Sequence, residues 1–127
     1  MGKQNVVLSN LNHTWFIDLD GTVFKHNGYK IDGHDTLLPG VKEFLSSIPE
    51  KDLIVIVTSR TDDYRELTLK ALKENNIRYD EIVFNCPYGE RVVINDNKPS
   101  GLETGKAINL SRDEGLKNIS IKIDEKL

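Results

Sequence analysis

The chain has little of what defines several large classes of protein. Its single cysteine, Cys86, excludes an internal disulfide and favours a reducing compartment such as the cytoplasm; we expect Cys86 to pack at a strand end rather than to act as a nucleophile. No apolar run is long enough to span a bilayer and no signal-peptide pattern opens the chain, so we expect no membrane partner. The net charge is -3 and there is no basic stripe, which argues against a nucleic-acid partner.

What remains is the composition of a globular protein. The chain has 127 residues, of which 38% are hydrophobic, and its 9 glycines and 4 prolines are ordinary numbers. We find no repeat, linker or low-complexity tract. The sequence therefore predicts a single domain over residues 1–127.

Patterns typical of strands and helices alternate along the chain. Short apolar runs predict strands at 14–18, 53–57, 81–84, 91–96 and 119–123. Amphipathic patterns predict helices at 39–48, 62–76 and 101–110. Residues 25–35 are rich in Gly, His and Asp and predict a loop or a small flap hairpin.

This alternation predicts an α/β fold. We expect a single Rossmann-like doubly wound sheet, mostly parallel, with helices on both faces. In such a sheet, ligands bind beyond the carboxyl ends of the strands. Polar residues follow three predicted central strands at that edge: Asp18 and Asp20, Thr58 and Ser59, and Asn95 and Asp96.

The crowding of carboxylates at this edge needs a compensating charge. Asp18 and Asp20 are two apart on extended backbone and so face one pocket, and Asp96 adds a third carboxylate. Two unit charges about 4 Å apart repel by roughly 4 kcal/mol at an effective dielectric near 20. Either a proton is shared or a cation lies among them, and Mg²⁺ is the cation that suits such oxygen ligands.

Groups that bind anions are predicted beside the carboxylates. The turn at Gly21 and Thr22 can offer backbone N–H groups, and Thr58 and Ser59 add hydroxyls and amides where a strand meets a helix. A cation among carboxylates, facing such donors, is typical of a site for a phosphoryl group.

These same residues carry a resemblance to a known family. The stretches "FIDLDGTVF", "VIVTSR" and "VVINDNKP" resemble the first, second and fourth motifs of the haloacid dehalogenase (HAD) superfamily of phosphohydrolases. The resemblance runs from about residue 15 to 110. It implies a Mg²⁺-dependent phosphomonoester hydrolase that forms an aspartyl phosphate.

The resemblance also implies a role for each matching residue. Asp18 is expected to be the nucleophile, and Asp20 to protonate the leaving group and then activate water. Asp18, Asp96 and the main-chain carbonyl of Asp20 are expected to hold Mg²⁺, and Thr58 to bind the phosphoryl oxygens. Arg60 is a further candidate for contact with the substrate.

The third motif of the family, a Lys or Arg that neutralises nucleophile and phosphate, is not fixed by the sequence. Lys98 is our first choice because it follows Asp96, and Arg91 is the alternative; Lys73 and Arg78 are weaker. We expect Asn95, in place of the usual acid, to weaken metal binding.

Short intervals between the motifs leave no room for the cap domain that many HAD enzymes carry, so we expect a capless form. We expect His26 and His34 to belong to the flap. "GHDTLLPGVKEF" and "INDNKPSGLETGKA" resemble small HAD proteins found with surface-polysaccharide genes, which suggests a phosphosugar or another small phosphorylated metabolite as substrate.

Two other functions use similar residues. A phosphotransferase or mutase has the same chemistry and differs in the acceptor of the phosphoryl group. A signalling receiver domain also combines an acidic cluster with Thr or Ser and Lys, but its acid pair is adjacent. Here Leu19 separates the acids and Gly-Thr follows them, which favours the enzyme.

Overall fold

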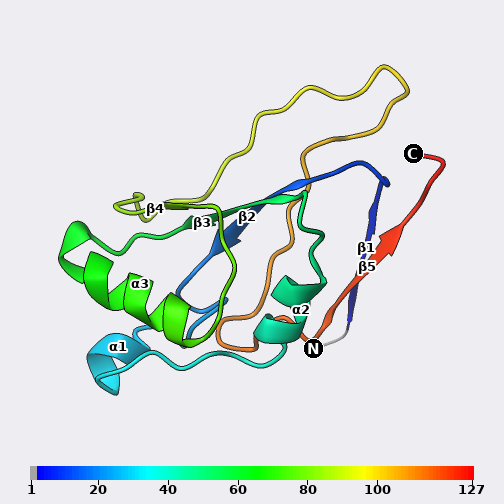
Figure 1. The fold of residues 1–127 in the computed structure, drawn as a ribbon. Coiled ribbons are helices and arrows are strands. Elements are labelled where there is room, and N and C mark those ends of the chain that lie inside the picture. The colour runs from blue at the N-terminus through cyan, green and yellow to red at the C-terminus, as the bar shows by residue number, and fades with distance from the viewer. Residues whose placement is uncertain (1–2) are drawn as a thin grey trace.

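The strands form two small parallel sheets rather than one. In a computed structural model, which describes residues 3–127, β2 (Thr14–Asp18), β3 (Leu53–Val57) and β4 (Glu81–Val83) form a parallel sheet in the order β2-β3-β4. β1 (Gln4–Leu8) pairs in parallel with β5 (Ile119–Ile123), and this pair lies beside the first sheet (Figure 1). The prediction of parallel strands is confirmed. That of a single sheet is wrong because, among residues 3–127, β1 and β5 pair only with each other.

Two of the three predicted helices are present. α2 (Val41–Ser47) lies within the predicted range 39–48, and α3 (Arg65–Glu74), which follows the 3-10 turn η1 (Asp62–Tyr64), lies within 62–76. Both helices were predicted from an apolar face, and residues of that face are buried: Leu45 of α2 and Leu72 of α3.

The predicted flap hairpin contains a helical turn, α1 (Gly28–Ile31). Phe24 and Leu37, on either side of it, form an isolated antiparallel bridge, and Lys25 N–H donates to the carbonyl of Thr36 at 2.9 Å. The segment therefore closes on itself as a hairpin does, with a helical turn in place of a plain loop.

Helices cover one face of the β2-β3-β4 sheet. On the opposite face, Phe16, Leu53 and Val83 are 61%, 43% and 47% exposed, which contradicts the prediction of helices on both faces. In Figure 1 the three α-helices lie below the sheet and residues 85–105 loop above it. Apolar residues of the covered face pack with residues of α2 and α3 in one core: Ile17, Ile54, Ile56, Val41, Leu45 and Leu72.

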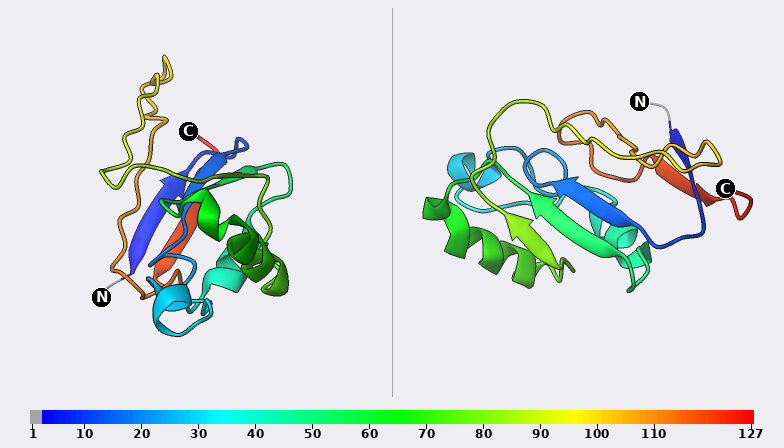
Figure 2. Two further views of the ribbon diagram at one scale, coloured as in Figure 1. Left: turned by 90° about the vertical axis from the view of Figure 1, so that its left-hand side faces the viewer. Right: turned by 90° about the horizontal axis from the view of Figure 1, so that it is seen from above.

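The stretch between β4 and β5 contains neither the strand predicted at 91–96 nor the helix predicted at 101–110. It runs as an irregular loop away from the sheet (Figure 2), and Val92 and Ile94 are 80% and 93% exposed. Among residues 3–127 no strand pairs with this apolar run, so the predicted strand does not form. Gly101 and Gly105 weaken the helical pattern that follows it.

The end of this stretch returns to pack against the start of α2. Leu116 N–H donates to the carbonyl of Pro39 at 2.9 Å. Gly40, with φ 74°, lies so close to this segment that a Cβ on it would be 2.5 Å from the backbone nitrogen of Lys117. Glycine is required there because any other side chain would collide with backbone. The contact brings residues 111–117 beside the turn that follows β2.

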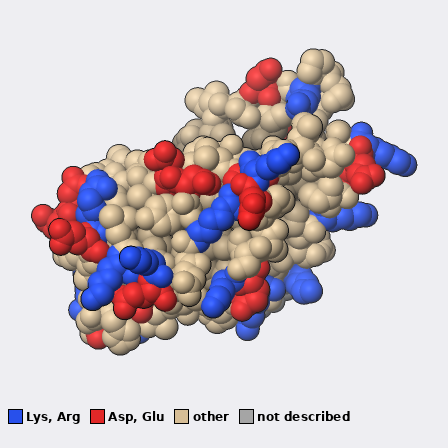
Figure 3. All heavy atoms as spheres, viewed as in Figure 1, with Lys and Arg blue, Asp and Glu red and all other residues tan. Residues whose placement is uncertain are grey.

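The surface carries both signs of charge side by side. Figure 3 shows Lys and Arg interspersed with Asp and Glu on the face that it displays. Within residues 3–127, no helix combines the length and the apolar character needed to cross a bilayer.

Candidate functional site

Asp18 ends β2, and its carboxylate is contacted from two sides. Its Oδ2 accepts a hydrogen bond from the hydroxyl of Thr22 at 3.0 Å, and its Oδ1 lies 3.3 Å from Nη1 of Arg91. The Asp18 and Arg91 side chains are 41% and 39% exposed, so both are open to a ligand. The structure thus brings a carboxylate and a guanidinium together at the carboxyl end of the strand.

The turn after β2 uses its backbone groups internally. Gly21, with φ 86°, donates its N–H to the carbonyl of Phe24 at 2.7 Å, and Thr22 N–H donates to the carbonyl of Leu19 at 3.3 Å. The amides that we expected to bind phosphate are therefore already paired. The part of this turn that faces Asp18 is the Thr22 hydroxyl.

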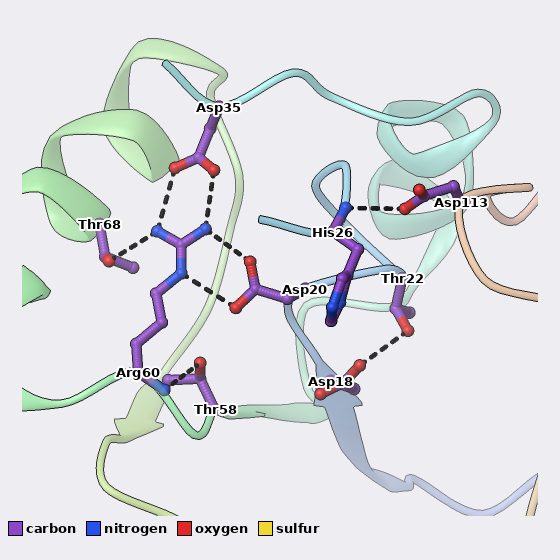
Figure 4. A network of polar contacts seen from close by, with 9 residues as sticks. All are labelled: Asp18, Asp20, Thr22, His26, Asp35, Thr58, Arg60, Thr68 and Asp113. Carbon is purple, nitrogen blue, oxygen red and sulfur yellow. Dashed lines mark hydrogen bonds and ion pairs between the residues drawn. The ribbon is translucent and has the colours of Figure 1, made fainter. Parts of the chain in front are cut away.

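Arg60 is held by hydrogen bonds to three side chains (Figure 4). Nε and Nη2 donate to the two oxygens of Asp20 at 3.1 and 2.8 Å. Nη1 and Nη2 donate to the two oxygens of Asp35 at 3.0 and 2.7 Å, and Nη1 also donates to Thr68 Oγ1 at 2.9 Å. Every N–H group of the guanidinium thus has a partner within the protein.

This network is buried and carries a net negative charge. The Arg60 and Asp35 side chains are each 1% exposed, and that of Asp20 is 19% exposed. Burial disfavours the charged guanidinium, but the hydrogen bonds and charges of Asp20 and Asp35 outweigh it and raise the pKa of Arg60 above its ordinary value. We conclude that Arg60 orients Asp20, a role that differs from the expected contact with the substrate.

Tyr29, from α1, stacks on this guanidinium. Cζ of Arg60 lies 3.9 Å from the centre of the Tyr29 ring. Burial, with the nearby charge of Asp20, raises the pKa of the Tyr29 hydroxyl, so that the phenol stays neutral at physiological pH. The flap is thereby fixed to the end of β3 through Arg60.

The two hydroxyl residues after β3 lie differently. Thr58 is 1% exposed, and its Oγ1 accepts a hydrogen bond from the backbone N–H of Arg60 at 3.1 Å. It therefore shapes the loop that carries Arg60 and does not reach the pocket, contrary to its predicted contact with phosphoryl oxygens. Ser59 is half-buried and lines the pocket.

A pocket of about 240 Å³ opens beside these residues. Asp18 and Asp20 share it with side chains from the flap and from the long loop, the stretch between β4 and β5. Besides these two it is lined by His26, Asn27, Tyr29, Lys30, Ser59, Arg60, Tyr88 and Arg112.

His26 and Arg112 line the pocket, although neither was assigned a role in the site from the sequence. The imidazole of His26 points toward Asp18 (Figure 4), and the backbone N–H of His26 donates to Asp113 Oδ1 at 2.7 Å. Arg112 reaches the pocket because Asp113 N–H donates to the carbonyl of Gly21 at 2.9 Å. Only the packing of distant segments could reveal Arg112, whereas His26 was visible as a flap residue. His34 is exposed and does not line the pocket.

Asn95, Asp96 and Lys98 lie in the exposed part of the long loop. Asn95 Nδ2 donates to Thr104 Oγ1 at 2.7 Å, and that hydroxyl donates to the carbonyl of Asp96 at 2.5 Å. Since no strand forms at 91–96, Lys98 is not carried to the pocket. Arg91, our second choice, is the cation that contacts Asp18.

The predicted magnesium ligands are not assembled. Among residues 3–127 no three His, Cys, Asp or Glu side chains form a group that could hold a metal ion. Asp18 already contacts Thr22 and Arg91, and both oxygens of Asp20 accept hydrogen bonds from Arg60. In this arrangement the three expected ligands do not form a site that fits Mg²⁺.

Comparison of the chain with protein-family models, with curated proteins and with solved structures found no match.

Proposed function

We propose that this protein hydrolyses phosphate monoesters with Asp18 as the nucleophile, the activity that its resemblance to the HAD superfamily implies. The observation that carries the proposal is the setting of Asp18: an exposed carboxylate beside the Arg91 guanidinium, in a pocket where the His26 imidazole points toward it. A small phosphorylated metabolite, such as a phosphosugar, is the proposed substrate.

In the first step, an Asp18 oxygen forms a bond to phosphorus while the bond from phosphorus to the ester oxygen breaks. Arg91 offsets the negative charge of the carboxylate and the phosphoryl group as they approach each other. The leaving alkoxide takes a proton from protonated His26. The products are an alcohol and phosphorylated Asp18.

In the second step, water attacks the phosphorus of the aspartyl phosphate. Neutral His26 takes the proton from the water as a general base. The bond from phosphorus to Asp18 breaks, phosphate leaves and the carboxylate is restored. His26 takes the acid–base role that the resemblance assigned to Asp20, because Arg60 occupies both oxygens of Asp20.

Dependence on Mg²⁺ is a separate proposal that rests on the sequence alone. Of the predicted ligands, Asp18 and Asp20 lie in the pocket and Asp96 lies in the exposed loop. The activity assay therefore has one arm with Mg²⁺ and one with a chelator. A rate that falls on chelation and returns with added Mg²⁺ supports the ion, and an unchanged rate argues against it.

We expect Asp18→Asn to abolish hydrolysis of p-nitrophenyl phosphate, because the neutral amide is a poor nucleophile. Asp62→Asn, at an exposed residue paired with Arg65, is the matched control and should keep the wild-type rate. Circular dichroism checks that both variants are folded.

Acid quenching followed by mass spectrometry should detect phosphate on the peptide that contains Asp18 in the wild type. Full activity of Asp18→Asn contradicts the assignment. A long-lived phosphorylated Asp18 without release of phosphate indicates a phosphoacceptor domain instead. Transfer of the phosphoryl group to an added alcohol in preference to water indicates a phosphotransferase.

A further inference from the structure

Two cations, Lys30 and Arg112, lie in the wall of the pocket. The two acidic residues that line the pocket each have a cationic partner. Asp20 is paired with Arg60, which also lines the pocket, and Asp18 is paired with Arg91, which does not. Within residues 3–127, Lys30 and Arg112 form no ion pair. The whole chain has a net charge of -3, whereas these two cations make the pocket locally positive.

Lys30 extends from α1 and is held by aromatic rings. Its Nζ lies 5.6 Å from the ring centres of both Tyr29 and Tyr64, which contact each other edge to face at 5.0 Å. The negative faces of the rings hold an ammonium group in place but do not cancel its charge. Lys30 is therefore positioned without being neutralised.

Arg112 lies on another element, beside the turn that follows Asp18. A Cβ on Gly21 would be 3.3 Å from Arg112 Cγ, so the absence of a side chain at Gly21 makes room for this arginine. The backbone N–H of its neighbour Asp113 donates a hydrogen bond to the carbonyl of Gly21, and the Asp113 side chain accepts one from the backbone N–H of His26. Arg112 thus lies on the Asp18 side of the pocket, and Lys30 lies on the flap.

We propose that the substrate carries a second anionic group, a phosphate or a carboxylate, which binds Lys30 while the reacting phosphoryl group binds near Asp18. This inference rests on the proposed function and narrows its substrate class. Arg112 lies beside the Asp18 turn and is placed to bind the reacting phosphoryl group, whereas Lys30 lies on the flap and is left for the second anion. Charge-assisted hydrogen bonds are the strong ones, so this contact contributes to selectivity.

The test compares substrates in matched pairs. Glycerol 3-phosphate is compared with 3-phosphoglycerate, and glucose 6-phosphate with glucose 1,6-bisphosphate. We expect kcat/KM to be at least about tenfold higher for the member with the second anion. The pair that shows the larger ratio tells whether that anion is carboxylate or phosphate.

Variants connect the selectivity to Lys30. Lys30→Gln should remove the preference, so that kcat/KM becomes equal for the two members of each pair. Lys25→Gln is the matched control on the same segment, because Lys25 is already paired with Asp32 at 2.9 Å, and it should keep the preference.

Failure of the inference is distinguishable from failure of the proposed function. Equal kcat/KM within both pairs, or a preference that survives Lys30→Gln, overturns the second anion site and leaves the hydrolase standing. If no ester is hydrolysed, the hydrolase proposal fails, and calorimetric titration with glucose 1,6-bisphosphate and glucose 6-phosphate decides the inference. Tighter binding of the bisphosphate that Lys30→Gln abolishes supports it; equal binding overturns it.

Discussion

Arg60 joins two carboxylates that come from different parts of the chain. Asp20 follows β2, and Asp35 lies in the segment after α1, and each forms a two-pronged contact with the same guanidinium. A planar fork of donors suits this arrangement, which a lysine could not reproduce. The sequence pointed to Asp20 and Arg60 as polar residues at strand ends. It gave no signal for Asp35, because a single acid in a polar loop looks like any solvated residue.

We expect Asp35→Asn to lower the free energy of unfolding by about 1–3 kcal/mol, because the amide removes a buried charge and turns one acceptor into a donor that faces Arg60. Arg60 keeps Asp20, so the loss should be smaller than for a completely unpaired buried charge. Urea denaturation followed by circular dichroism measures it.

Asp32→Asn provides the comparison from the same segment. The Asp32 side chain is 31% exposed, and its pair with Lys25 lies at the surface. Such pairs contribute about 0–1 kcal/mol, so this variant should remain close to the wild type. Equal losses in the two variants would contradict the view that Asp35 holds Arg60 in place.

The strands and helices that formed as predicted are those whose apolar residues are buried against a neighbouring element. β2 and β3 are apolar runs that find each other in parallel register, with Ile17 opposite Ile56, and Leu45 and Leu72 of α2 and α3 are buried as their patterns indicated. β1 was missed because Gln4–Leu8 becomes a strand only through pairing with β5, more than a hundred residues away. A local pattern does not reveal whether a strand finds a neighbour.

Glycine at the junction between the long loop and α2 provides a test at the scale of elements. Gly115 has φ 77°, and a Cβ there would overlap the carbonyl oxygen of Pro39. Gly115→Ala should therefore cost more than the about 1 kcal/mol of a strained backbone alone, because the segment must also move away from α2. Thermal and urea unfolding measure the loss.

Gly33→Ala separates the two contributions. Gly33 has nearly the same backbone, φ 80°, but an added Cβ would meet nothing within 4 Å. It reports the cost of the backbone alone, and the difference between the two variants reports the contact with Pro39. No difference between them would mean that the 111–117 segment does not press on α2.

At the scale of the whole molecule, the pocket is built by segments far apart in the sequence. The Asp18 turn, the flap, the loop after β3 and the residues near Arg112 meet because 111–117 returns to the start of α2. The sequence located the carboxyl ends of β2 and β3 and therefore Asp18, Asp20 and Ser59. It misplaced Asp96 and Lys98, since their position depended on a strand at 91–96 that does not form.

That run of apolar residues yields the sharpest test of the overall arrangement. Ile94 is 93% exposed, whereas Ile56, in an equally β-branched run on β3, is 1% exposed. Ile94→Lys should change the free energy of unfolding by no more than about 0.5 kcal/mol, as surface substitutions do, while Ile56→Lys buries an unpaired charge and should cost more than about 3 kcal/mol. Urea denaturation of the two variants beside the wild type measures both. A large loss from Ile94→Lys would mean that 91–96 is a buried strand in solution. The third carboxylate, Asp96, would then end a strand as Asp18 does. It could lie beside Asp18 and Asp20 as the third ligand of the proposed Mg²⁺ site.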